Sequence, residues 1–237
     1  MIRYKSLIFS ILLLLSPLEA KPPHLTPQTT RKKAEEIFKS HVIHKELTYE
    51  VGNRILQNFI EELDPHKMYL FNNEVLKFTS PTDQLLNTLI RNFKKEKFDF
   101  FEDIYQIMAR AIERRNTLEE QISSLPLPKN IKVSDFNDLN WCEDKNELSE
   151  RLLKLRAIQL ETAEKLDCES SHQFLERLKK ARLTREKEIT QTNSKESKQQ
   201  CLAYFMKAFS SALDNHTAYF TPREASEFMF QMQHRLF

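Results

Sequence analysis

The chain has 237 residues and a formal net charge of +2, with 36 basic and 34 acidic residues. This balance gives no basic patch for nucleic acid or an anionic membrane, so we expect no nucleic-acid partner. Glycine occurs once, as Gly52. Phosphate-binding loops, oxyanion holes and tight hairpins rely on glycine, which adopts positive φ at little cost, so the composition argues against a complete hydrolase or nucleotide-binding domain.

Residues 1–20 have the pattern of a secretory signal peptide. The basic residues Arg3 and Lys5 precede the apolar run LIFSILLLL, and the small residue Ala20 closes the segment. The run is shorter than the roughly 20 residues that a spanning helix needs, although an uncleaved anchor is the alternative. We therefore expect a periplasmic protein that starts near Lys21 and has no stable membrane span after cleavage.

Residues 21–30 contain three prolines and no apolar periodicity, which is typical of a flexible leader. Further along the chain, apolar residues recur at the spacing of amphipathic helices with solvated charged faces. Thr48 is the expected N-cap of one helix, which Pro65 ends, and SPTD at 80–83 is expected to start another with Ser80 as its N-cap. Other helices are expected over 31–47, 98–123, 146–166, 171–190 and 198–213.

The segment 131–143 includes the only tryptophan, Trp141, and shows no clear period. No stretch has a convincing strand pattern. We therefore predict an all-α, irregular multi-helix fold of about seven to eight helices, without a substantial sheet, over residues 31–237. It can divide into two sub-bundles, about 31–125 and 145–237.

The chain contains three cysteines, Cys142, Cys168 and Cys201, in a compartment expected to be oxidising. One disulfide with one free thiol and three buried free thiols are both open. Their spacing matches no zinc motif. His41 and His44 are three residues apart on an expected helix, but without a third ligand they make a weak metal site. We predict no metal and no cofactor.

A short cassette occurs twice. LDPHKMYLF at 63–71 returns as LDNHTAYFT at 213–221, and an aromatic residue stands four positions before the leucine in both copies. The shared positions are Phe59, Leu63, Asp64, His66 and Tyr69 in the first copy, and Phe209, Leu213, Asp214, His216 and Tyr219 in the second.

Each Asp–His pair could form an acid/base site, but the two residues are only two positions apart and no nucleophile stands at the same place in both copies. We therefore predict no catalytic residue. The cassette is better interpreted as a way to end a helix, in which the aspartate accepts backbone N–H groups and the tyrosine buries its ring. Pro65 or Asn215 turns the chain, and Thr221-Pro222-Arg223-Glu224 is expected to start a further helix.

The second copy resembles a known family. ALDNHTAYFTPREASEF at 212–228 is similar to the segment that leads into the PDZ domain of tail-specific, or C-terminal processing, proteases. The matching residues are Asp214, His216, Thr217, Tyr219, Phe220, Pro222 and Phe228, while Asn215 stands where the family usually has proline. The first copy, together with NDLNW and ERLLKLRAIQLE, resembles the helical region of long periplasmic members.

The resemblance implies a helical N-terminal region followed by a PDZ domain and a serine protease core with a Ser/Lys dyad, which cuts proteins recognised by apolar C-termini. The sequence stops at Phe237, where the PDZ domain would begin, so the chain is expected to be truncated and inactive alone. In the family, such regions support the other domains and contribute to dimerisation or adaptor binding. We expect a homodimer or association with a PDZ–protease fragment. The alternatives are a free-standing periplasmic binding or chaperone module and a stand-alone protease.

Overall fold

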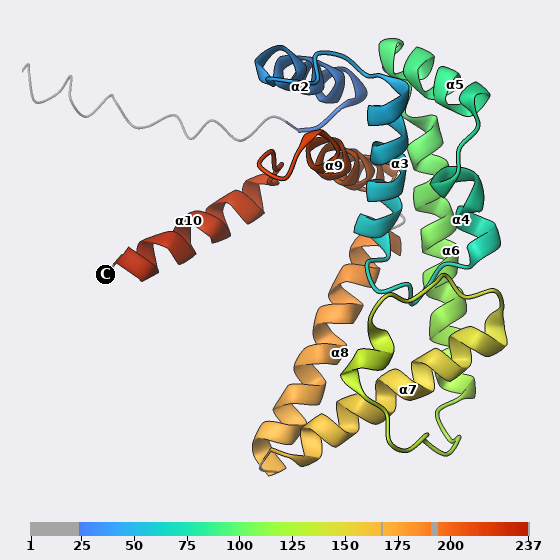
Figure 1. Ribbon diagram of the computed structural model, residues 1–237. Coiled ribbons are helices and arrows are strands. Elements are labelled where there is room, and N and C mark those ends of the chain that lie inside the picture. Colours follow the sequence, from blue (N-terminus) through green and yellow to red (C-terminus); the bar gives the residue numbers. More distant parts are fainter. Residues whose placement is uncertain (1–23, 167, 191–193, 237) are drawn as a thin grey trace, which may run out of the picture.

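The computed structural model describes residues 24–166, 168–190 and 194–236, so the expected signal peptide and Lys21 lie outside it (Figure 1). The described ranges contain nine α-helices, one short 3₁₀ helix and no sheet. They are α2 (Pro27–Ser40), α3 (Tyr49–Leu63), α4 (Asn72–Thr79), α5 (Asp83–Lys94), α6 (Asp99–Gln121), η1 (Val133–Phe136), α7 (Lys145–Glu164), α8 (Cys168–Thr190), α9 (Ser194–Leu213) and α10 (Pro222–Leu236). The all-α prediction is confirmed, with one helix more than expected.

The first described helix begins earlier than the sequence pattern suggested. Helix α2 starts at Pro27, within the segment interpreted as a flexible leader, and the Thr26 hydroxyl accepts the backbone N–H of Thr29 at 3.2 Å. Thr30 is buried within the helix. The leader prediction is therefore wrong for residues 27–30, because a threonine N-cap and a proline in the first turn favour a helix here.

Helix α4 was not expected from the sequence. It follows the first cassette directly, and the Glu74 carboxylate accepts the backbone N–H of Phe71 at 2.8 Å. Ser80 ends this helix and does not cap the next one. Thr82 instead caps α5 by accepting the Leu85 N–H at 3.3 Å, so the expected N-cap was wrong by two residues.

The two helices that end in the cassettes, α3 and α9, pack against each other. Figure 1 shows α3 lengthwise and α9 nearly end-on behind it, so the two helices cross. At the crossing, the Asn58 side-chain amide lies 2.9 Å from Ser211 Oγ. The cassette residues Phe59, Leu63, Phe209 and Leu213 are all buried here. The repeat therefore supplies both halves of the central helix pair.

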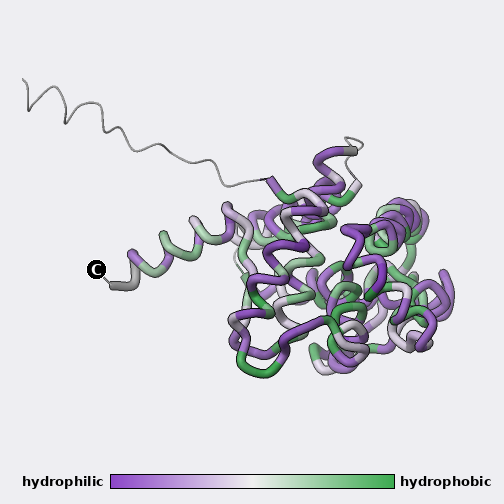
Figure 2. The backbone as a smooth tube through the Cα atoms, turned by 90° about the horizontal axis from the view of Figure 1, so that it is seen from above, coloured by the Kyte–Doolittle hydropathy of each residue, from purple (hydrophilic) through white to green (hydrophobic). Residues whose placement is uncertain are grey.

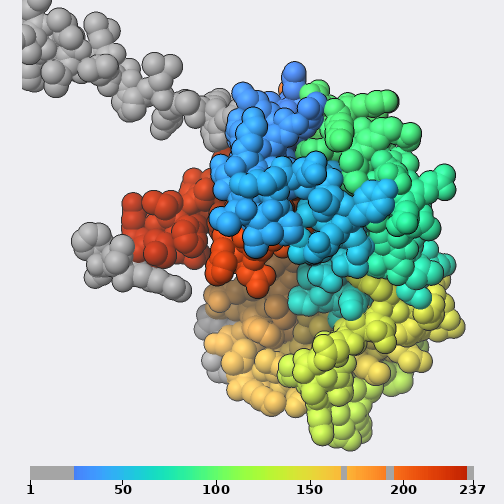
Figure 3. Space-filling view, turned by 45° about the horizontal axis from the view of Figure 1, so that its top comes forward, coloured from blue at the N-terminus to red at the C-terminus, as the bar shows by residue number. Residues whose placement is uncertain are grey.

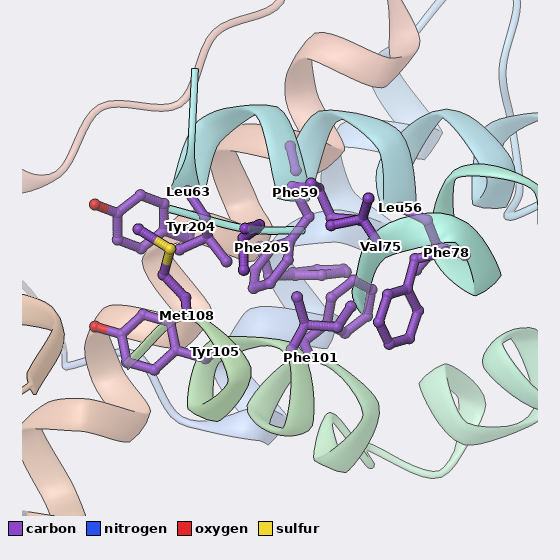
Figure 4. Packing of buried hydrophobic residues seen from close by; sticks show 14 of the residues in the cluster. Leu56, Phe59, Leu63, Val75, Phe78, Phe101, Tyr105, Met108, Tyr204 and Phe205 are labelled. Atoms are coloured by element: carbon purple, nitrogen blue, oxygen red, sulfur yellow. The ribbon is translucent and has the colours of Figure 1, made fainter. Parts of the chain in front are cut away.

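Aromatic rings fill the space between this helix pair and α6 (Figure 4). The Phe101 ring of α6 contacts Phe59 of α3 and Phe205 of α9 edge-on, with ring centres 5.0 Å and 4.8 Å apart. Such pairs stabilise a core by about 0.5–1.5 kcal/mol beyond the area they bury. The buried apolar residues form one cluster that includes residues from α2 to α9. The two halves at 31–125 and 145–237 thus share one core.

Cys142 and Cys201 are buried free thiols, and every possible pair among the three cysteines includes one of them. In the described parts of the chain, neither of these two thiols forms a disulfide. Burial raises the pKa of the Cys142 thiol to about 11, so this thiol is a poor nucleophile at neutral pH. The Cys168 side chain lies outside the described parts. None of the helices described here has the length and apolar character of a membrane span.

Candidate functional site

The first cassette forms a turn around the carboxylate of Asp64, which follows the last residue of α3. Its Oδ1 accepts the N–H of Met68 at 2.8 Å, and its Oδ2 accepts those of Tyr69 and Leu70 at 2.9 and 3.0 Å. Asp64 is almost fully buried. This burial raises the pKa of Asp64, although the three backbone bonds oppose the effect. The carboxylate thus folds the chain back onto the end of the helix.

Tyr69 fixes the exit from this turn. Its ring is buried, and its hydroxyl donates to Glu186 Oε1 of α8 at 2.9 Å. The guanidinium of Arg115 on α6 lies 4.5 Å from the centre of the ring. Burial raises the pKa of Tyr69 far above its usual range. The first cassette is therefore attached to α6 and α8 by one side chain.

Arginines of α6, α7 and α8 also donate to backbone carbonyls of the first cassette. The pairs are Arg114 to Tyr69 at 2.6 Å, Arg151 to Lys67 at 2.8 Å, and Arg185 to Leu63 at 2.9 Å. Carbonyls at a helix end lack partners within the helix, so a bond such as that of Arg185 completes the end of α3. Sequence reasoning missed these arginines because contacts between distant residues leave no local pattern.

The second cassette forms a similar turn around Asp214, which follows α9. Asp214 Oδ1 accepts the N–H groups of His216 and Thr217 at 2.8 and 2.7 Å, and Oδ2 lies 2.8 Å from His41 Nε2. Hydrogen bonds from Thr217 and from His41 hold the pKa of Asp214 well below its usual range. Tyr219 is only half-buried, in contrast to Tyr69, and packs at the edge of the core.

Both ring nitrogens of His41 have partners. Nδ1 accepts the backbone N–H groups of Ile43 and His44 at 3.2 and 2.9 Å, so in the neutral ring the proton is on Nε2 and points to Asp214. His44 Nε2 in turn lies 2.9 Å from a guanidinium nitrogen of Arg54. Across the described residues, no group of three or more histidine, cysteine or acidic side chains is placed to hold a metal ion.

The histidines of both cassettes lie at the protein surface. Pro65, His66 and His216 are exposed. Ser210, which precedes the second copy, donates to the Met206 carbonyl of its own helix at 2.9 Å. In the ranges that the structure covers, no cassette histidine is hydrogen-bonded to a serine, so the base–nucleophile contact of a hydrolase is not present there.

Several charges on the helix faces that the sequence suggested were solvated are in fact buried. Arg115, Arg151 and Glu186 are each at most 8% exposed. Arg182 of α8 lies 2.8 Å from Glu119 of α6, so it joins the two helices, and it lies 3.1 Å from Glu186 of its own helix. The i,i+4 spacing of acidic and basic residues in these helices is visible in the sequence. The burial of these side chains, however, follows only from how α6 and α8 pack.

Helix α10 starts with a reciprocal cap. Thr221 Oγ1 accepts the Glu224 N–H at 3.3 Å, and Glu224 Oε2 accepts the Thr221 N–H at 2.9 Å, with Pro222 as the first helical residue. Lys207 of α9 lies 2.5 Å from Glu224 Oε1. Lys207 and Thr221 lower the pKa of Glu224, which burial alone would raise. These contacts attach the start of α10 to the body.

Beyond its first turns, α10 extends away from the other helices (Figures 1 and 3). Figure 2 shows apolar positions in green among polar ones along this helix. Three of its exposed apolar residues, Phe228, Met229 and Met232, are here called the α10 apolar stripe. Their exposed fractions are 47%, 56% and 41%. Phe220 stacks on Phe228 with ring centres 5.6 Å apart, so one side of the stripe faces the second cassette.

The chain was compared with known families and proteins. The family described as the tail-specific protease N-terminal domain matches residues 33–223, a range that includes both cassettes and the start of α10. A search of curated proteins finds no significant match. Because the family match covers most of the sequence, the chain belongs to the tail-specific protease N-terminal domain family, a non-catalytic part of these proteases.

Proposed function

We propose that this chain is the supporting part of an exported, periplasmic tail-specific protease, and that it holds a PDZ–protease portion through the α10 apolar stripe. The complete enzyme would degrade or process proteins from apolar C-termini. The observation that carries the proposal is the stripe itself, three exposed apolar side chains at helical spacing on a helix that extends away from the body. Such surfaces on soluble proteins mark interaction sites.

The contacts at the start of α10 suit this role. Lys207 and Glu224 fix the helix to α9, and Arg223 lies 3.4 Å from Glu188 of α8. The direction of α10 is therefore set by charged contacts at one end, while the stripe is left for another surface. The second cassette ends directly before this start, and its sequence resembles the segment that leads into the PDZ domain of these proteases.

Size-exclusion chromatography with light scattering tests the proposal, with the chain alone and mixed with a PDZ–protease fragment of a tail-specific protease. We expect the chain to co-elute with the fragment or to form a dimer. A Met229→Gln/Met232→Gln variant should lose this association, whereas Gln233→Ala, an exposed polar position on the same helix, should retain it. A wild-type chain that stays monomeric and ignores the fragment would contradict the proposal.

We also propose that the chain has no peptidase activity alone. Incubation with a disordered protein substrate should leave that substrate intact. Cleavage that is abolished by His66→Ala or His216→Ala would instead show that the cassettes are catalytic, and would overturn this part of the proposal.

A further inference from the structure

A cleft of about 720 Å³ lies between α6, α7 and α8, and the turn of the first cassette contributes to its wall. Sites for small organic ligands have volumes of roughly 300–1,000 Å³. The α10 apolar stripe does not line this cleft. The cleft is therefore separate from the surface assigned to the PDZ–protease portion.

The apolar part of the wall comes from α7 and α8. Leu152 and Leu155 project from α7, and Leu175 and Leu178 from α8. On α8 the lining changes along the helix, because Arg182 and Arg185 follow the two leucines on the same face. With a rise of 1.5 Å per residue, Leu175 and Arg185 are about 15 Å apart along the axis. The cleft thus has an apolar stretch that leads to basic side chains.

The charged part of the wall has more positive than negative groups. Five basic side chains line the cleft, Arg115, Arg156, Lys179, Arg182 and Arg185, against the two carboxylates of Asp64 and Glu119. The first carboxylate accepts three backbone N–H groups, and the second pairs with Arg115 and Arg182.

Three of the basic groups that line the cleft have no acidic partner among the described residues. In the described parts of the chain, Arg156, Lys179 and Arg185 form no salt bridge, and the hydrogen bonds of Arg156 and Arg185 go to backbone carbonyls. Arg115, which pairs with Glu119, is buried, and its Nε–H has no acceptor among the described residues. Basic side chains that share a cleft without counter-charges favour an anionic ligand.

We propose that the cleft binds a small organic acid with an extended apolar chain and one terminal carboxylate, as in a medium-chain fatty acid. The leucines of α7 and α8 cover the chain, and the unpaired basic groups hold the carboxylate. Arginine suits this role because its planar guanidinium bonds both oxygens of a carboxylate. A neutral apolar ligand would leave these positive groups without a counter-charge.

Isothermal titration calorimetry of the full chain with decanoate, below its micelle concentration, tests this. We expect saturable binding of one decanoate per chain. Decan-1-ol, which has the same chain without the charge, should bind at least about tenfold more weakly, because it cannot form the charge-assisted hydrogen bonds of a carboxylate. Equal binding of the acid and the alcohol would overturn the proposal, and so would tighter binding of decyltrimethylammonium.

Paired substitutions locate the site. The double variant Arg156→Gln/Lys179→Gln should bind decanoate about tenfold more weakly. The matched control Lys154→Gln/Lys180→Gln alters exposed lysines of the same two helices that do not line the cleft, and it should bind like the wild type. If both double variants bound decanoate equally weakly, the loss of net positive charge would explain the effect, and the proposal would be overturned.

Binding must also be independent of α10. The Met229→Gln/Met232→Gln variant should bind decanoate like the wild type, whereas Leu178→Gln, at a partly exposed position in the cleft wall, should weaken it several-fold. The opposite pattern would place the ligand on the α10 apolar stripe and overturn the assignment.

Discussion

His41 Nε2 lies 2.8 Å from Asp214 Oδ2 and joins the end of α2 to the end of α9, although the two residues are 173 positions apart. The side chain of His41 is 6% exposed and that of Asp214 is 36% exposed, so the pair lies at the edge of the core. Asp64, at the equivalent place in the first cassette, is buried, and among the described residues its carboxylate bonds only to backbone N–H groups. The same local motif therefore closes one turn inside the protein and one at its surface.

Replacing the two aspartates should have unequal effects. Asp64→Ala leaves the buried N–H groups of Met68, Tyr69 and Leu70 without an acceptor, and each such group costs about 1–3 kcal/mol. We expect a loss of at least about 3 kcal/mol in the free energy of unfolding by urea. Asp214→Ala should cost less, because water can replace the carboxylate. Equal losses would contradict the difference in burial.

Stability should fall in acid partly through Asp214. Its pKa in the folded protein lies below the ordinary 3.8, so the ionised form stabilises the fold above that value, and this stability is lost as the pH falls toward the folded pKa. We expect urea unfolding of the wild type to weaken more between about pH 5 and about pH 3 than that of Asp214→Asn. The raised pKa of Asp64 acts in the opposite direction but is common to both proteins.

A control separates this effect from general acid denaturation. Asp103 is exposed and makes no hydrogen bond or ion pair within the described residues. Asp103→Asn should lose as much stability on acidification as the wild type. If Asp214→Asn also follows the wild type, the carboxylate of Asp214 does not stabilise the fold.

The two cassette tyrosines look alike in sequence but differ in burial. Truncating a large buried aromatic side chain costs about 3–5 kcal/mol, and we expect Tyr69→Ala to fall in this range. Tyr219 is half-buried, so Tyr219→Ala should cost about half as much. Thermal unfolding followed by circular dichroism measures both. A melting temperature that is unchanged by Tyr219→Ala would mean that this ring does not anchor the chain.

Tyr69→Phe tests the hydroxyl separately. It keeps the ring but removes the donor to the buried Glu186, which is left with Arg182 and Asn116 as partners. We expect a loss of about 1–2 kcal/mol in the free energy of unfolding. A neutral substitution would show that the ring packing alone fixes the first cassette to α8.

Helix ends were the features most readily predicted from the sequence. Thr48 and Thr221 cap helices as expected, because a capping side chain and the N–H that it accepts are three residues apart. The features that could not be predicted from the sequence depend on the whole fold. The contact of His41 with Asp214 joins residues that are far apart in the sequence, and the burial of Glu186 depends on how the helices pack. No local sequence pattern predicts either feature.

Although the chain has a single glycine, it still forms turns that need a left-handed backbone conformation. Within the residues that the structure describes, four other than glycine adopt the left-handed conformation, Lys67, Glu96, Asn130 and Asp138, with φ between 51° and 62°. Gly52, by contrast, is buried in α3 and does not have positive φ. The chain therefore makes the turns that usually use glycine, and makes them with residues that have a Cβ atom.

Glu96 is the clearest case for substitution. It follows the end of α5, where its N–H bonds to the Phe93 carbonyl at 3.0 Å and the Lys97 N–H bonds to the Asn92 carbonyl at 2.9 Å. This is the Schellman pattern, in which glycine is the preferred residue at the left-handed position. The ion pair of Glu96 with Arg31, at 3.5 Å, is partly exposed and contributes little.

Glu96→Gly should therefore stabilise the protein. Relief of the Cβ contact in the left-handed region favours glycine by about 1–2 kcal/mol, and the greater freedom of glycine in the unfolded chain offsets part of this gain. We expect a net gain of about 0.5–1 kcal/mol in urea unfolding. Glu96→Ala removes the same ion pair but keeps the Cβ atom, so it should give no gain. If alanine stabilised as much as glycine, the carboxylate and not the backbone conformation would be the source of the strain.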